Sequence, residues 1–144
     1  MQYARKPSTS FSVTFGVKAG YDSRPQSRYG INLVDEEVMN SIKARIAVVS
    51  AWTAAMEDES DVALVTAVAN VSRAVYPQRM GCPPEGELTV TMSGTRNPDY
   101  CPREAEYVNA LIRIVERVKQ SLDQRRVTLT IWDEAGVEFL YFTD

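Results

Sequence analysis

One segment of the sequence combines residue types that bind anions and nucleotides. Residues 93–104 read SGTRNPDYCPRE and lie between a predicted strand and a predicted helix. The free amide groups at a helix start attract negatively charged groups. Arg96 can form a bidentate contact with phosphate, Asn97 can hydrogen-bond to a base or ribose edge, and Tyr100 offers a stacking surface. These residues are a candidate ligand site, although a turn followed by a helix cap explains them without a ligand.

Two further groups of basic residues are placed to contact the same ligand. The run QRRV at residues 124–127 joins the second predicted helix to a strand, so Arg125 or Arg126 would project toward a phosphate. The alternative is that this charge only compensates the helix dipole. The long loop after the first predicted strand interleaves aromatic and basic side chains, and Arg28 is its candidate ligand contact. Solvation of a surface loop is the simpler reading of that pattern.

The residue types that are missing exclude several kinds of catalysis. The chain has no histidine, which removes the commonest general base and the commonest zinc ligand. Cys101 stands at a predicted helix start, where a thiol can be activated, but no histidine can serve as its base. The acidic runs at 57–61 and 133–134 read as a helix exit and a turn. We therefore predict no catalytic residue, no metal and no cofactor.

The whole chain has the size and balance of one globular domain. It has 144 residues, of which 44% are hydrophobic and 24% are charged. Residues 1–10 are polar and without periodicity, so we expect a flexible arm ahead of one domain at 11–144. With no secretory or membrane-spanning pattern, we expect a cytoplasmic protein with Cys82 and Cys101 as thiols. A net charge of −3 argues against a duplex nucleic-acid partner.

Hydrophobic periodicity predicts seven elements that would position these residues. The predicted strands lie at 11–17, 62–76, 88–92, 127–131 and 137–142, and the predicted helices at 36–56 and 102–122. Only 62–76 is ambiguous, because its valines favour a strand while their spacing also fits a helical stripe.

This order predicts an α+β fold, β-α-β-β-α-β-β, with a mainly antiparallel sheet and two helices on one face. The other face would mix polar and apolar side chains and offer a surface for self-association. It would carry Thr128, Thr130, Trp132, Leu140 and Phe142.

Three segments together resemble a known family. They are VTFGVKAGY at 13–21, SGTRNPDY at 93–100 and LDQRRVTLTIWDE at 122–134. In this order they resemble the phage Thoeris anti-defence proteins of the sponge type. The resemblance implies a homo-oligomer that binds a cyclic ADP-ribose-type immune signal, and in some relatives cyclic oligonucleotides, without degrading it. It also implies that Phe15 packs at the pocket, Arg96 and Asn97 contact the ligand, and Arg126 meets the pyrophosphate.

Two alternatives from other classes stay open at this point. An enzyme that cleaves a nucleotide through Cys101 or carboxylates would release products on incubation. A phage protein-protein inhibitor or structural oligomer would bind no small molecule and would use the face around Trp132.

Overall fold

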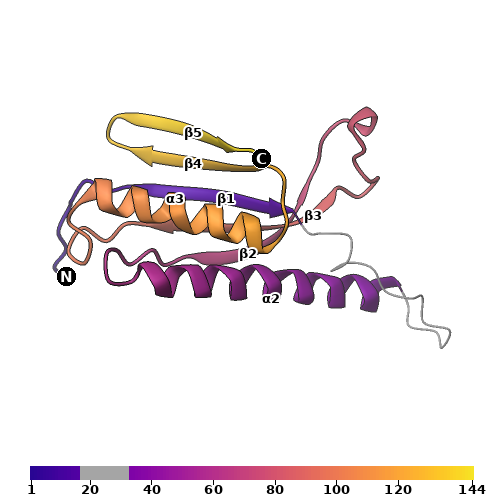
Figure 1. Ribbon diagram of the computed structural model, residues 1–144, viewed down its shortest axis with the longest axis horizontal. Helices are drawn as coiled ribbons and strands as arrows, with labels where there is room; N and C mark the ends of the chain where they lie inside the picture. The colour runs from indigo at the N-terminus through magenta and orange to yellow at the C-terminus, as the bar shows by residue number, and fades with distance from the viewer. Residues whose placement is uncertain (17–32) are drawn as a thin grey trace.

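The computed structural model describes residues 1–16 and 33–144 (Figure 1). The described strands are β1 (Ser10–Gly16), β2 (Val68–Ala74), β3 (Glu87–Thr95), β4 (Val127–Asp133) and β5 (Gly136–Phe142). The described helices are α2 (Leu33–Glu59) and α3 (Glu104–Ser121), with a short 3-10 helix at Gln78–Met80. Neither long helix is apolar enough to cross a membrane, and the rest of the described chain holds no such helix.

All five described strands form one antiparallel sheet in the order β2-β3-β1-β4-β5. Helices α2 and α3 pack against each other and against the same face of this sheet, as Figure 1 shows. The predicted α+β fold and its element order are therefore confirmed. The segment 62–76 also contains a strand, β2, because pairing with β3 stabilises its valine-rich second half.

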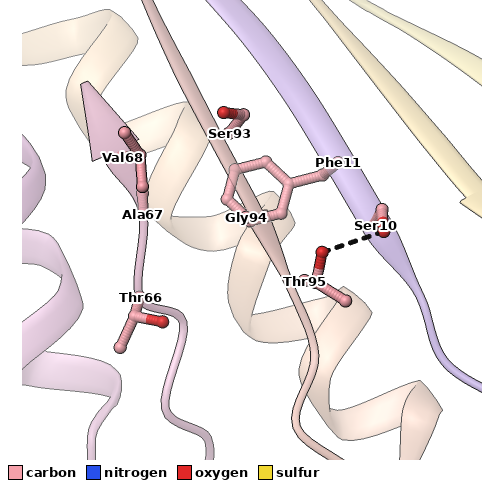
Figure 2. Close-up of a pocket in the computed structure, with 8 residues that line it drawn as sticks. All are labelled: Ser10, Phe11, Thr66, Ala67, Val68, Ser93, Gly94 and Thr95. Atoms are coloured by element: carbon pink, nitrogen blue, oxygen red, sulfur yellow. Dashed lines mark hydrogen bonds between the residues drawn. The ribbon is translucent and has the colours of Figure 1, made fainter. Parts of the chain in front are cut away.

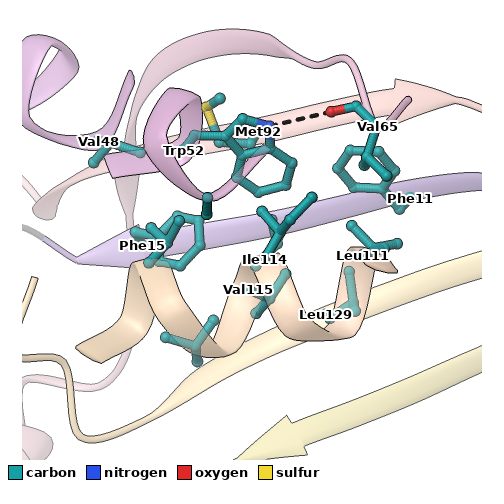
Figure 3. Packing of buried hydrophobic residues seen from close by; sticks show 14 of the residues in the cluster. Phe11, Phe15, Val48, Trp52, Val65, Met92, Leu111, Ile114, Val115 and Leu129 are labelled. Carbon is teal, nitrogen blue, oxygen red and sulfur yellow. Dashed lines mark hydrogen bonds between the residues drawn. The ribbon is translucent and has the colours of Figure 1, made fainter. Parts of the chain in front are cut away.

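The core lies between the sheet and the two helices. On β1, Phe11, Val13 and Phe15 are buried while their neighbours are not, which is the alternation expected of a strand covered on one face. Trp52 of α2 stacks on Phe11 with ring centroids 5.7 Å apart and meets Phe15 edge-on at 6.5 Å (Figure 3). Its indole nitrogen donates to the Val65 carbonyl oxygen at 3.4 Å. These aromatic contacts fix α2 over the centre of the sheet.

The second face of the sheet differs from the prediction in one respect. Leu140 and Phe142 pair with Leu129 and Val127, whose side chains are buried, so they face the core. We had expected Leu140 and Phe142 on the open face. The tight turn sets the pairing of β4 with β5, and this register is shifted by one residue from the expected one. The apolar side chains on the open face are Trp132, Val137, Phe139 and Tyr141. Self-association through this face stays a prediction.

Serine and threonine side chains cover the middle of the open face. Strands β1 and β3 place hydroxyl groups opposite each other, and Thr14 Oγ1 lies 2.8 Å from Thr91 Oγ1. Further along, Ser72 Oγ lies 2.8 Å from Thr89 Oγ1. Neither described helix covers this face.

The end of the N-terminal arm is tied to the loop after β3. Lys6 forms an ion pair with Asp99, and the Ser8 hydroxyl donates to the Arg96 carbonyl oxygen. The Arg96 amide donates to the Thr9 carbonyl oxygen at 2.7 Å. Residues 6–9 thus continue from the N-terminal end of β1 and lie against the loop after β3.

Candidate functional site

Arg96, the centre of the predicted site, is buried in the structure. Its side chain is only 7% exposed, and its Nη1 donates to the Cys101 carbonyl oxygen at 2.9 Å. Its Nε lies 3.4 Å from Thr9 Oγ1. These bonds hold the loop after β3 against the start of β1. A ligand contact at Arg96 stays a prediction, although the guanidinium already has protein partners.

The residues next to Arg96 form a turn, which is the arrangement that the sequence also predicts without a ligand. Asn97 Oδ1 accepts a hydrogen bond from the Asp99 amide at 2.9 Å, and its carbonyl oxygen accepts one from Cys101 at 2.9 Å. Tyr100 is 75% exposed. Asn97 thus orders its own loop, while the Tyr100 ring is accessible from solvent.

The other candidates do not join Arg96. Arg126 directly precedes β4, whereas Arg96 lies beside Ser10, which pairs with Trp132 near the far end of β4. A strand of this length separates the two arginines by about 20 Å. Phe15 is 0% exposed in the core, and Arg28 lies outside the described residues. Among the candidates that the structure describes, Arg96, Phe15 and Arg126 therefore do not lie together within a single chain.

A different cluster gathers at the end of the sheet where β1 stops and β3 begins. It consists of Gly16, Tyr76, Glu87 and Gln124, which we call the Glu87 corner. A methyl group placed on Gly16 would lie 2.7 Å from Gln124 Oε1 and 3.7 Å from Glu87 Oε1. Side-chain oxygens from β3 and from the α3–β4 connection therefore both lie close to the end of β1.

Tyr76 and Glu87 interact across the ends of the β2–β3 hairpin. Partial burial, together with the nearby Glu87 carboxylate, raises the pKa of Tyr76 above its usual range. The phenol therefore remains protonated at neutral pH and acts as a neutral donor. Glu87 provides a carboxylate at the mouth of the corner.

Polar groups on adjacent strands extend the corner. Thr89 pairs with Gly16 across the sheet and is only 3% exposed, and its hydroxyl donates to the Ser72 carbonyl oxygen at 3.1 Å. Continuing the β1–β4 register by two residues places the exposed Arg126 opposite Gly16. The corner thus combines a carboxylate, a carboxamide, hydroxyl groups and a guanidinium.

A hollow of about 660 Å³ opens at the other end of the sheet (Figure 2). It lies where β2 begins and β3 ends, with the Phe11 ring against Gly94. Its polar side chains are the hydroxyl groups of Ser10, Thr66, Ser93 and Thr95. None of the described residues that line it is charged. A charged ligand would therefore find better partners at the Glu87 corner.

Comparison with known proteins decides the family. The family model described as SAM lyase matches residues 6–143. The chain belongs to the SAM lyase family. The search of curated proteins found no match to this chain.

Two solved structures share the fold of this family member. One is a phage SAM lyase in complex with S-methyl-5'-thioadenosine, with 16% identity and a TM-score of 0.56. The other is a phage SAM lyase in the apo state, with 14% identity and a TM-score of 0.57. In each case the match covers 100% of this chain and 95% of the solved chain.

The family corrects three predictions from the sequence. A lyase is an enzyme, so the prediction of a protein without catalytic activity was wrong. The predicted sequestration of a cyclic ADP-ribose-type signal, and that signal as partner, are wrong for the same reason. The comparisons do not support the resemblance to the Thoeris sponges. They support only the coarser statement that the chain shares its fold with small phage proteins. The alternative of an enzyme that cleaves a nucleotide comes closer.

The sequence contained one signal that points to the corner. Gly16 stands where the alternation of β1 calls for a polar side chain, and a glycine in a strand pattern often marks a close approach by another group, here the Gln124 side chain. Tyr76 and Glu87 lie on either side of a proline-rich loop, so their proximity depends on the hairpin register. Neither residue belongs to a local motif, and both were missed.

Proposed function

We propose that this protein cleaves S-adenosylmethionine (SAM) and releases S-methyl-5'-thioadenosine. The SAM lyase family match over residues 6–143 carries the proposal. The fold shared with a phage SAM lyase that holds S-methyl-5'-thioadenosine supports the nature of the product. A phage-encoded enzyme of this kind would act in the host cytoplasm, where its substrate is made.

The reaction breaks one bond between sulfur and the four-carbon amino-acid chain. The bonding electrons go to sulfur, which changes from a sulfonium cation into a neutral thioether. The four-carbon fragment must then form one new bond. Its own carboxylate oxygen can attack the carbon that leaves sulfur and close a five-membered lactone, or a neighbouring carbon can lose a proton and form a double bond.

The lactone route suits this chain because it needs no base from the protein. The nucleophile is part of the substrate, so catalysis requires orientation and removal of water more than proton transfer. A chain without histidine can supply both. We therefore propose intramolecular displacement, with homoserine lactone as the second product.

The Glu87 corner has charges that complement this substrate. The substrate carries positive charge at the sulfonium and the amino group and negative charge at its carboxylate. Glu87 would face the positive end, and the exposed Arg126 opposite Gly16 would meet the carboxylate. Tyr76 would hold Glu87 in place, and Ser72 and Thr89 offer hydroxyl groups beside the pair.

Turnover by matched variants tests this assignment. Purified protein should convert SAM to S-methyl-5'-thioadenosine, measured by liquid chromatography with mass detection. Glu87→Gln keeps the shape of the side chain but removes its charge, and should lower kcat/KM by about tenfold to a hundredfold. Arg103→Gln is the control, because Arg103 is exposed at the start of α3 and pairs only with the exposed Glu106 among described residues. Full activity in Glu87→Gln would move the site elsewhere.

A further inference from the structure

Helix α2 carries apolar side chains on two of its sides. One row packs into the core and consists of Ala44, Val48, Trp52 and Ala55. A second row, which we call the outer row, consists of Met39, Ile42, Ile46 and Val49 on another side of the helix. Met39 is 39%, Ile46 57% and Val49 37% exposed. A helix that is apolar on more than its core side is normally covered there as well.

The spacing of the outer row suits a helical partner. Its members follow one another at intervals of three, four and three residues, which aligns them along one stripe of α2. Two α-helices that pack side by side in a coiled coil use this spacing. Single exposed apolar side chains are ordinary on a protein surface, whereas a continuous apolar stripe marks an interaction site. We therefore expect another helix to cover the outer row.

The charges on α2 indicate which helix this is. Three acidic residues of α2 form ion pairs within the chain: Glu37 with Arg73, Asp58 with Arg117 and Glu59 with Arg113. Lys43 and Glu57 are exposed, and neither has an ion-pair partner among the described residues. They stand two seven-residue repeats apart, so they lie on the same side of the apolar stripe, one toward each end of the helix. The helix is thus complementary to an inverted copy of itself.

We infer that the outer row packs against the outer row of a second copy of this chain, with the two α2 helices antiparallel. In this orientation Ile46 of each copy lies opposite the partner's Val49, and Lys43 of each copy extends toward the partner's Glu57. Two-fold symmetry makes the two ion pairs identical. A parallel pair would place each Lys43 level with the partner's Lys43, and like charges repel. Antiparallel helices also oppose their dipoles.

This surface is separate from the proposed site of catalysis. Glu87 and Thr89 alternate along β3 with Leu88 and Val90, which belong to the core between the sheet and the helices. Glu87 therefore lies on the open face of the sheet, whereas α2 lies on the covered face (Figure 1). A dimer through α2 leaves the Glu87 corner uncovered in both copies.

The mass of the protein in solution tests the surface. Analytical ultracentrifugation should show wild-type protein mostly as a dimer at about 100 μM. Ile46→Glu puts a charge in the outer row of both copies and should weaken the dimer by at least about a hundredfold. Because Ile46 is exposed, the variant should keep its circular dichroism spectrum. Phe139→Glu changes the exposed apolar face of β5 instead, and should leave the dimer intact.

An exchange of charges tests the orientation. Lys43→Glu and Glu57→Lys should each weaken the dimer by about tenfold, because each change creates two contacts between like charges. The double variant restores opposite charges and should return the affinity to within about threefold of wild type. Rescue of this kind requires the two residues to face each other across the dimer.

Four results would overturn the inference. They are a monomeric wild-type protein at about 100 μM, an assembly of another size, a dimer that Phe139→Glu breaks while Ile46→Glu does not, and a double variant as weak as the single ones. None of these measurements involves SAM. The inference and the proposed function can therefore fail independently.

Discussion

At the scale of single residues, a few side chains decide the chemistry of the Glu87 corner. Tyr76 is the residue whose protonation matters most there. Its raised pKa means that the phenol keeps its proton at any pH at which the enzyme would normally work. Its role in the proposed site is to donate to Glu87 and restrict the carboxylate to one orientation.

Removing the Tyr76 hydroxyl should weaken catalysis. Tyr76→Phe keeps the ring and deletes the hydroxyl beside Glu87. We expect kcat/KM to fall by about tenfold, measured as release of S-methyl-5'-thioadenosine. A Tyr76→Phe variant as active as wild type would show that the hydroxyl has no part in the reaction.

Tyr107 is a second tyrosine with an unusual environment. It is 1% exposed on α3, and its hydroxyl has no described hydrogen-bond partner. Burial raises the pKa of Tyr107 far above its usual value, with a further rise from Cys101 and an opposing effect of Arg96. In the unfolded chain the group would titrate near 10.0. Stability is therefore full below that pH and is lost as the pH rises above it, because only the unfolded state releases the proton.

Replacing Tyr107 should protect the fold against alkali. Tyr107→Phe removes an unpartnered hydroxyl, so the free energy of unfolding at pH 7 should be unchanged or higher by about 1 kcal/mol. Between pH 10 and 12 the variant should lose less stability than wild type in urea titrations. Equal alkaline loss in both proteins would show that Tyr107 does not cause it.

At the scale of elements, the end of β5 is attached to α3 through a buried charge. Lys119 of α3 is 3% exposed, and its Nζ lies 2.9 Å from Asp144 Oδ1 just beyond β5. Burying an ammonium group is costly unless it is paired. Because Asp144 itself is largely exposed, we expect this pair to contribute about 1 kcal/mol.

A double-mutant cycle tests this attachment. Asp144→Asn should lower the free energy of unfolding by about 1 kcal/mol, because the buried ammonium loses its charged partner. Lys119→Met keeps the length of the side chain and removes the charge, so adding Asp144→Asn to it should cost nothing further. Equal effects of Asp144→Asn in both backgrounds would show that the two residues are not coupled.

The elements themselves could be predicted from the sequence because each has a local cause. The alternation of Phe11, Val13 and Phe15 follows from one covered face, and the apolar stripe of α3 follows from packing on the sheet. The facing of β5 could not be predicted, since the turn at Asp133–Gly136 sets its register. A shift of one residue reversed the expected facing of Leu140 and Phe142.

At the scale of the whole molecule, the topology of the sheet separates two of the predicted site residues. Arg96 directly follows β3 and Arg126 directly precedes β4, and the strand pairing places them at opposite ends of the sheet. The Glu87 corner instead brings together residues from β1, the β2–β3 hairpin and the α3–β4 connection. The spacing of these residues along the sequence does not reveal such pairings. The family match supports the proposed activity but does not identify the site.

The most direct test of SAM cleavage without water uses ¹⁸O-labelled solvent. Purified protein is incubated with SAM, and both products are measured at early times by mass spectrometry and NMR. The proposed function predicts equal amounts of S-methyl-5'-thioadenosine and homoserine lactone, with no ¹⁸O in the newly formed lactone. Absence of S-methyl-5'-thioadenosine, or homoserine that carries ¹⁸O from the first turnovers, would contradict it.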